Sequence, residues 1–340
     1  MQKRLFTILK YIFFLGLGIF LVWWSLHKMT KDEFTEFLNS LKTADYSLVL
    51  PVFMILTASH VSRAMRWRIL IKPLGYSPRL SNTFCAVMVG YLANFAFPRL
   101  GEVLKCTIIT RYEKVPADKL VGTVLVERAV DVLSFFIVIV ISLLTQASVV
   151  GQYAKEKFME YFTNKGDIAI MKIAITLAVI AIVFFVMRFI FTRFLHIKLV
   201  QQVKKIYHNI IEGLSSIKKL ENKWAFIFHS VFIWSCYLVG TYVGFHAIKD
   251  TSVLPVLSTF PVLSFGTVAT MITPGGIGAY PEFLRDAMLL YNIPKIAGYA
   301  NGWLQWSAQF VIILVVGFIS LIVLPYLNKS KNEISTVDTQ

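Results

Sequence analysis

Three charged residues lie inside an apolar segment and are the first candidates for chemistry. Glu127, Arg128 and Asp131 fall within residues 124–140, where nearly every other side chain is apolar. Glu127 and Asp131 are four positions apart, so a helix places them on one face. A charge at membrane depth costs about 2.5–3.5 kcal/mol on insertion scales and marks a substrate or proton pathway by default. The alternative is an interfacial position near the cytoplasmic surface, where the charges cost little.

Two short segments rich in proline and glycine interrupt the apolar pattern, at residues 98–102 and 274–278, which we call the first and second breaks. They lie 176 residues apart, and a glutamate and a new apolar segment follow each. Such pairs of interrupted segments point to a transporter site, because irregular backbone at membrane depth must be buried or line a cavity. The helix after each break would offer free N–H groups to an anion such as phosphate. The alternative is two ordinary turns between spans.

A basic and aromatic group follows the apolar residues 46–62. It contains Arg63, Arg66, Trp67 and Arg68, and Arg63 and Arg66 share a helix face. One interpretation is the cytoplasmic end of a span, with basic residues and an aromatic belt. The other is a site for a lipid headgroup, because arginine forks match the geometry of phosphate. The sequence leaves both open.

Charged residues also follow the second break. Glu282 and Arg285 are three positions apart, so they could form a simple ion pair, with a role in gating or proton coupling as the weaker alternative.

No catalytic or metal-binding motif accompanies these residues. The sequence contains no nucleophile elbow, no zinc-protease helix, no Walker A loop and no dinucleotide-binding glycine motif. The six histidines are scattered, and Cys85, Cys106 and Cys236 have no metal-ligand spacing. We therefore expect no catalytic residue, no metal and no cofactor.

The composition indicates an integral membrane protein. Of 340 residues, 56% are apolar and 16% are charged, and the mean hydropathy is +0.66. Soluble domains typically carry about 25% charged residues, so a disordered chain, a disulfide scaffold and an ordinary cytosolic enzyme are excluded. The net charge of +15 is better explained by basic cytoplasmic loops than by nucleic-acid binding.

The apolar pattern predicts an all-α, polytopic helix bundle with six to eight embedded helices. The two breaks make two segments broken or re-entrant, related as pseudo-repeats. We expect a membrane domain over residues 1–327 and a polar cytoplasmic tail over 328–340. The predicted apolar helices are 5–26, 46–62, 80–98, 120–144, 168–187, 224–248, 253–272, 283–291 and 296–327, and the amphipathic ones are 30–41 and 200–223.

The distribution of basic residues predicts the orientation. Residues 63–79 contain five Lys and Arg and no acid, and residues 188–223 contain eight and two acids. These loops and both termini are therefore expected in the cytoplasm. Residues 99–119 are also basic, so the segment 80–98 would enter the membrane and return without crossing it.

Four motifs, taken in order, resemble the lysylphosphatidylglycerol synthase transmembrane region, a flippase-like family of inner-membrane proteins. They are Arg63-x-x-Arg66-Trp67-Arg68-x-Leu70, Asn94-x-x-x-Pro98-Arg99-x-Gly101-Glu102, Val126-Glu127-Arg128-x-x-Asp131 and Thr273-Pro274-Gly275-Gly276-Ile277-Gly278-x-x-x-x-Glu282. The resemblance covers about residues 5–327. It implies a membrane domain that moves a lipid between leaflets: aminoacylated phosphatidylglycerol in the full-length synthases, and polyprenyl-phosphate-linked sugars in relatives. The synthases carry a cytosolic aminoacyl-transferase domain that we do not expect here.

We therefore predict a lipid translocase without enzymatic activity in the bacterial inner membrane. Its cargo would be an anionic or aminoacylated phospholipid, or a polyprenyl-phosphate lipid. Arg99, Arg128 and the helix N-termini would hold the lipid phosphate, while Glu102, Glu127 and Asp131 would balance the arginines or accept a cationic headgroup. The candidate lipid-binding residues are Arg63, Arg66, Arg68, Asn94, Pro98, Arg99, Gly101, Glu102, Glu127, Arg128, Asp131, Pro274, Gly275, Gly276, Gly278 and Glu282.

Membrane lipids are the expected partners, a separate lipid-modifying enzyme is a candidate partner, and nucleic acid is not expected. Two alternatives come from other classes. One is a partner-dependent membrane transferase, such as a phosphatidylglycerol lysyltransferase. The other is an ion-coupled transporter of a small solute, because intramembrane carboxylates fit that function too.

Overall fold

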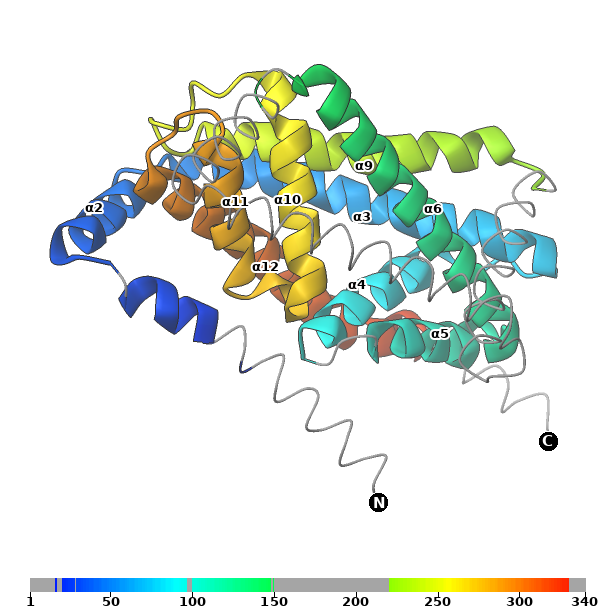
Figure 1. The fold of residues 1–340 in the computed structure, drawn as a ribbon. Coiled ribbons are helices and arrows are strands. Elements are labelled where there is room, and N and C mark those ends of the chain that lie inside the picture. The colour runs from blue at the N-terminus through cyan, green and yellow to red at the C-terminus, as the bar shows by residue number, and fades with distance from the viewer. Residues whose placement is uncertain are drawn as a thin grey trace, which may run out of the picture.

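The computed structural model describes residues 16, 20–27, 29–96, 100–147, 149 and 220–329. Regular secondary structure in these residues is helical, without strands, which confirms the predicted all-α helix bundle (Figure 1). The predicted helix 168–187, nearly all of 200–223 and the tail from residue 330 lie outside the described residues, so the predicted number of embedded helices stays a prediction.

The first long helix extends further than the sequence suggested. Helix α3 spans Val49–Ile71, whereas we expected the span to end at residue 62, before the basic and aromatic group. Nothing in the sequence stops the helix there, because it contains no glycine and no proline after Pro51. It ends only at Lys72-Pro73-Leu74 and at Gly75, whose φ is +87°. Arg63, Arg66 and Trp67 are thus buried residues of α3 rather than an interfacial collar.

A short amphipathic helix precedes α3, as predicted. Helix α2 spans Lys31–Lys42, and Thr30 and Glu33 form a capping box at its start. The backbone N–H of Thr30 donates to the Glu33 carboxylate and lowers the pKa of Glu33. Phe37 is buried against Tyr299, while Phe34 and Leu38 are exposed, so α2 lies against the bundle along one edge.

Three further helices are long. Helix α6 spans Ala117–Thr145, α9 spans Lys223–Phe245 and α12 spans Lys295–Leu327. Among the described residues, 46–74, α9 and α12 are long and apolar enough to cross a membrane; α6 has the length but carries the charged residues. Many large apolar side chains on these helices are exposed, for example Leu144 at 76%. A surface of this kind suits lipid rather than water.

Each break separates two helices too short to cross a bilayer alone. At the first break, α4 (Leu80–Ala96) packs against α5 (Leu100–Glu113), and residues 97–99 lie outside the described ones. A Cβ atom on Gly101 would overlap the carbonyl group of Gly90, so the two helices approach as closely as glycine allows. The result is a helical hairpin.

The second break forms a similar hairpin with a different joint. Short helix η4 (Val256–Ser258) leads into α10 (Thr259–Ile272), which is joined to α11 (Ala279–Leu289) through the short turn η5 (Pro274–Gly276). Here Gly275, Gly276 and Gly278 have φ values of +61°, +77° and +72°. This left-handed backbone favours glycine, so the three glycines of the sequence specify the turn at the second break.

The second break lies next to the end of α4. A Cβ atom on Gly275 would overlap the ring of Phe95, which is near the end of α4. Trp306 of α12 donates from Nε1 to the Gly275 carbonyl group at 2.8 Å. Helix α12 packs against both α4 and α11 and so holds the two hairpins together. Helices α3 and α9 lie side by side along the opposite part of the bundle (Figure 1).

Candidate functional site

Seven charged side chains meet between α3, α5 and α6. Most contacts within the group join a basic side chain of one helix to a carboxylate of another. We call this group the charged cluster. Its members are Arg63, Arg66, Glu102, Lys105, Glu127, Arg128 and Asp131.

Two arginines of α3 clamp the carboxylates of α6. Arg63 donates from Nη1 to Glu127 Oε1 at 3.1 Å and to Asp131 Oδ2 at 2.6 Å. Arg66 donates from Nη2 to Asp131 Oδ1 at 2.6 Å. The pairs meet because each helix repeats its charge on one face, three positions apart on α3 and four on α6. Neither interpretation of the sequence anticipated these contacts.

Lys105 completes the shell around Glu127, which is 0% exposed. Its Nζ lies 2.7 Å from Glu127 Oε2 and 4.6 Å from the centre of the Trp67 ring. The Trp67 ring is fixed in turn, because Nε1 donates to Thr123 Oγ1 at 2.9 Å. Sequence reasoning missed Lys105, which it counted as a loop charge; its position between Leu104 and Cys106, three residues after Glu102, was the available signal.

Polar groups of α9 and a ring of α4 support the two arginines. Arg63 donates from Nη2 to the Tyr237 hydroxyl at 3.1 Å, and Arg66 donates from Nη1 to Ser230 Oγ at 3.3 Å. The guanidinium of Arg63 lies 5.9 Å from the ring centre of Tyr91. Buried charges need such partners, because an unpaired charge in a low-dielectric interior is costly. No sequence pattern distinguishes Tyr91, Ser230 and Tyr237 from other residues of their spans.

The charged cluster carries one positive charge in excess, with four basic side chains against three carboxylates. Arg128 is the least engaged of the basic groups. Its side chain is 42% exposed, and its nearest carboxylate atoms are at 3.4 Å on Glu127 and 3.8 Å on Glu102 and Asp131. The planar fork of Arg128 therefore keeps donors free for an anion.

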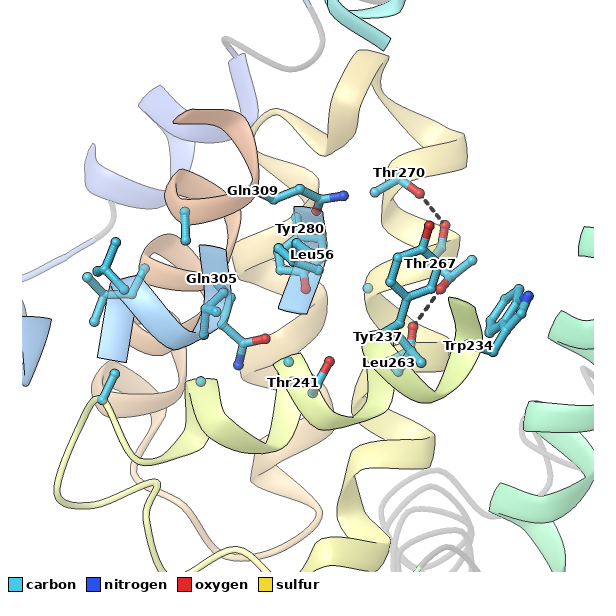
Figure 2. Close-up of a pocket in the computed structure, with 18 of the residues that line it drawn as sticks. Leu56, Trp234, Tyr237, Thr241, Leu263, Thr267, Thr270, Tyr280, Gln305 and Gln309 are labelled. Atoms are coloured by element: carbon cyan, nitrogen blue, oxygen red, sulfur yellow. Dashed lines mark hydrogen bonds between the residues drawn. The ribbon is translucent and has the colours of Figure 1, made fainter. Parts of the chain in front are cut away.

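A cavity of about 430 Å³ begins at the charged cluster and runs through the bundle. Arg63, Arg128 and Asp131 line one end, and Asp45 and Val49 line the other. Val49 and Arg63 are both on α3, so the two ends are about 21 Å apart at 1.5 Å per residue. Between them the wall is mainly apolar, with scattered neutral polar groups (Figure 2). The shape suits an amphiphile with its anionic group at the charged cluster.

The structure brings together six of the predicted site residues, Arg63, Arg66, Glu102, Glu127, Arg128 and Asp131, in the charged cluster. Two more border it. Asn94 and Gly101 line a small pocket beside Arg128 and Glu127, and Asn94 Oδ1 accepts from the Gly101 N–H at 2.8 Å. This N–H of α5, which we expected to be free for a phosphate, already has a partner.

Other predicted residues lie apart from the charged cluster. Arg68 donates from Nε to the Pro78 carbonyl group at 2.8 Å and so fixes the loop after α3. Glu282 forms an ion pair with Arg285, which also contacts Asp286, as the simpler interpretation of this motif predicted.

The predicted residues of the second break form the joint between α10 and α11, beside Phe95 and Trp306: Pro274, Gly275, Gly276 and Gly278. Pro98 and Arg99 lie outside the described residues, so their predicted contact with phosphate stays a prediction.

Within the described residues, no group of three or more His, Cys, Asp or Glu side chains is placed to hold a metal ion. Cys85, Cys106 and Cys236 are free and buried. The charged cluster pairs its carboxylates with basic groups instead.

Comparison with known proteins gives two matches. Residues 8–317 match the family model described as the lysylphosphatidylglycerol synthase TM region. A UPF0104 membrane protein of Methanocaldococcus jannaschii is 23% identical over 305 residues, which cover 81% of this chain and 84% of the relative. No solved structure matches the chain.

Proposed function

Because the chain belongs to the lysylphosphatidylglycerol synthase transmembrane family, we propose that it is a lipid translocase, which moves an anionic lipid between the leaflets of a membrane. The family assignment and the helix bundle establish a membrane protein.

The cavity with a charged cluster at one end is the observation that carries the proposal. A lipid joins a charged headgroup to long apolar chains, and this cavity joins an excess positive charge to mainly apolar walls. Ligand sites are typically concave and apolar, with a few placed polar groups that fix orientation. A small polar solute would leave most of the apolar wall of the cavity without apolar contacts.

Arg128 is the residue we assign to the lipid phosphate. It lines the cavity, is partly exposed and has no carboxylate atom nearer than 3.4 Å. Arg63 and Arg66 are held by carboxylates at 2.6 Å, so they would position Asp131 and the neighbouring Arg128 rather than bind the lipid. A phosphodiester carries one negative charge, which would neutralise the excess charge of the cluster.

Two other functions compete with this one. A partner-dependent membrane transferase would form a new lipid product from a donor, and an ion-coupled transporter would move a solute together with protons or sodium. Among the described residues one hydroxyl–imidazole pair is present, since Ser62 Oγ lies 2.8 Å from His229 Nδ1, but both residues lie outside the cavity lining. Glu127 and Asp131 are both occupied by basic side chains. These observations favour lipid translocation.

The test is leaflet translocation in proteoliposomes. Labelled phosphatidylglycerol, its lysyl form and a polyprenyl-phosphate sugar would be followed with the wild-type protein, with Arg128→Glu and in protein-free vesicles. We expect selective movement of one lipid class and its loss in Arg128→Glu. Arg111→Glu is the matched control, because Arg111 is exposed on α5 outside the cluster and the cavity. Unchanged transport by Arg128→Glu would refute the site assignment.

Failure to move any lipid, with insertion confirmed, would refute the translocase itself. Solute-driven proton or sodium flux would then support the transporter, and formation of a new lipid with added cell extract would support the transferase.

The proposal includes a bacterial inner-membrane location with both termini in the cytoplasm, because the basic loops favour that side. A tag at either terminus that is cleaved from the periplasmic side of intact cells would contradict this orientation.

A further inference from the structure

Tyr237 of α9 is a polar side chain at the charged end of the cavity, and its own proton has no acceptor. It lines the cavity together with Arg128 and Asp131 of α6. Its hydroxyl oxygen accepts from Arg63 Nη2 at 3.1 Å, and in the part of the chain that the structure describes the hydroxyl donates to no residue. A phenol has a proton to donate as well as lone pairs to accept with, so Tyr237 brings an unused donor to the cavity.

The position of Tyr237 is fixed from two sides. Its ring lies against the Trp234 ring, with the ring centres 5.9 Å apart and the planes at 73°, and Trp234 stacks in turn on Phe135 of α6. Its oxygen is held by Arg63, which is itself bound to Asp131 at 2.6 Å. Figure 2 shows the Tyr237 ring extending from α9 into the pocket. The hydroxyl is therefore preorganised, so binding through it costs little side-chain entropy.

Tyr237 and Arg128 lie at the same end of the cavity because Asp131 links them. Arg63 Nη1 and Arg128 Nη2 both approach Asp131 Oδ2, at 2.6 Å and 3.8 Å, and Arg63 is the residue that holds the Tyr237 hydroxyl. A hydroxyl that accepts a hydrogen bond from a cation is polarised, and in a low-dielectric interior this strengthens the hydrogen bond that it donates. The contact with Arg63 therefore makes Tyr237 a stronger donor than a phenol in water.

A second donor without a charge suits the site that Arg128 forms. The charged cluster has one positive charge in excess, so a single phosphate charge neutralises it. A further cation would leave a net charge in a poorly solvated site, which is costly. A planar guanidinium covers one side of a tetrahedral phosphate. Because Tyr237 comes from α9 and Arg128 from α6, the phenol is available for an oxygen that the guanidinium leaves free.

We propose that Tyr237 is a second binding residue for the anionic group of the cargo, and that its hydroxyl donates to one phosphate oxygen while Arg128 binds another. The inference rests on the proposed translocase and concerns how its site recognises phosphate, whichever headgroup the phosphate carries. Arg63 is then a positioning residue. Its guanidinium occupies a lone pair of the Tyr237 oxygen, so the proton of this hydroxyl is directed away from Arg63.

The test measures binding of a lipid that offers a phosphate and no further headgroup chemistry. Short-chain phosphatidylmethanol, a singly charged phosphodiester, is titrated into the purified protein in detergent, with diacylglycerol of the same chain length as the phosphate-free control. Tyr237→Phe removes only the hydroxyl group. We expect it to bind phosphatidylmethanol about tenfold more weakly, as the loss of one hydrogen bond to a charged group predicts, and to bind diacylglycerol as the wild-type protein does. Tyr242→Phe is the matched control, because Tyr242 is on the same helix and outside the cavity lining.

A second replacement separates donation to the cargo from support of Arg63. 3-Fluorotyrosine in place of Tyr237 keeps the ring and the hydroxyl, but the electron-withdrawing fluorine makes the phenol a stronger donor and a weaker acceptor. At a pH where this phenol stays protonated, we expect tighter binding of phosphatidylmethanol than in the wild-type protein. If Tyr237 only accepts from Arg63, binding weakens or stays the same, and that result would overturn the proposal.

Failure of this inference differs from failure of the translocase. Binding of phosphatidylmethanol that is lost in Arg128→Glu and unchanged in Tyr237→Phe would overturn the role of Tyr237 and leave the site at Arg128 intact. Equal weakening for phosphatidylmethanol and diacylglycerol in Tyr237→Phe, with a lower unfolding midpoint, would show a structural role and refute direct binding. No preference for phosphatidylmethanol in the wild-type protein would overturn the phosphate site as a whole. Leaflet translocation, measured separately in proteoliposomes, tests the translocase itself.

Discussion

The helix hairpins at the two breaks have similar outlines and different chemistry. The first, α4 and α5, borders the charged cluster and contributes Glu102 and Lys105 to it. The second, α10 and α11, faces the same cavity with neutral hydroxyl groups. The glutamate after each break illustrates the contrast, because Glu102 contacts Arg128 while Glu282 is paired with Arg285 outside the cavity lining. A helix hairpin therefore accompanies the break in both places, while the flanking residues determine the chemistry.

The breaks also differ in what stabilises them. The first depends on buried ion pairs and on close helix packing at Gly90 and Gly101. The second depends on the backbone conformation of three glycines and on the hydrogen bond from Trp306. The first should thus be sensitive to charge and the second to backbone shape.

The largest effect is expected from Glu127→Gln, which tests whether the first break depends on charge. The change leaves Lys105 and Arg63 beside a neutral amide in a site that is 0% exposed. Removing one partner of a buried ion pair typically costs about 3–5 kcal/mol. We expect a large drop in the thermal unfolding midpoint of the purified protein in detergent.

Glu282→Gln is the matched control for that experiment. Glu282 and Arg285 are partly exposed, so the loss should be less than about 1 kcal/mol. Equal destabilisation by the two substitutions would contradict the idea that the first break depends on charge more than the second does.

The next effect is expected from Gly275→Ala, which tests the backbone of the second break. Gly275 has φ +61° and would place its Cβ against the ring of Phe95. A non-glycine residue held in such a conformation costs about 1–3 kcal/mol. The unfolding midpoint measures this loss. Gly122→Ala in α6 should not destabilise the protein, because a Cβ atom there meets open space and alanine favours a helix more than glycine does; a similar loss in both variants would contradict the role of the left-handed turn.

A smaller effect is expected from Arg128→Lys, which separates charge from geometry at the charged cluster. Lysine keeps the positive charge but lacks the planar fork that binds phosphate with two parallel hydrogen bonds. Losing one charge-assisted hydrogen bond of about 1.5 kcal/mol corresponds to about tenfold weaker lipid binding. Initial rates of translocation measure it. Wild-type rates in this variant would show that charge alone is recognised.

The smallest effect is expected from Trp306→Phe. Phenylalanine keeps an aromatic ring beside Phe310 and removes the hydrogen bond to the Gly275 carbonyl group. The expected cost is about 0.5–1.5 kcal/mol, visible as a small shift of the unfolding midpoint. Trp224→Phe is the control, because Trp224 is exposed at the start of α9. A loss of stability as large as that of Gly275→Ala would mean that the hydrogen bond contributes as much as the glycine backbone to the stability of the second break.

The helices were largely predictable because hydropathy and glycine or proline act locally. The segments 30–41, 120–144, 224–248 and 296–327 correspond to α2, α6, α9 and α12. The second break lies between α10 and α11, whereas the first extends into the start of α5 at Leu100. The boundary after Ser62 was wrong, since arginines at the end of an apolar run resemble an interfacial collar. The ion pairs of Arg63 and Arg66 with carboxylates of α6 join residues far apart in the sequence, so only the tertiary structure shows them.

The site was predictable only where charge stands out against apolar residues. Glu127, Arg128 and Asp131 were visible for this reason. Lys105, Tyr237 and the uncharged polar residues that line the cavity were not, because a lysine in a basic stretch, or a tyrosine, threonine or glutamine in a span, has no distinctive local pattern. Their significance comes from convergence of separate helices on one cavity.

The unbroken course of α3 has a mechanical consequence. This helix is about 35 Å long at 1.5 Å per residue, and it carries Val49 at one end of the cavity and Arg63 at the other. A stiff rod without an internal hinge tilts as a whole. A tilt of α3 about a point between Val49 and Arg63 would widen one end of the cavity and narrow the other. The ion pairs of Arg63 and Arg66 with the carboxylates of α6 oppose such a tilt.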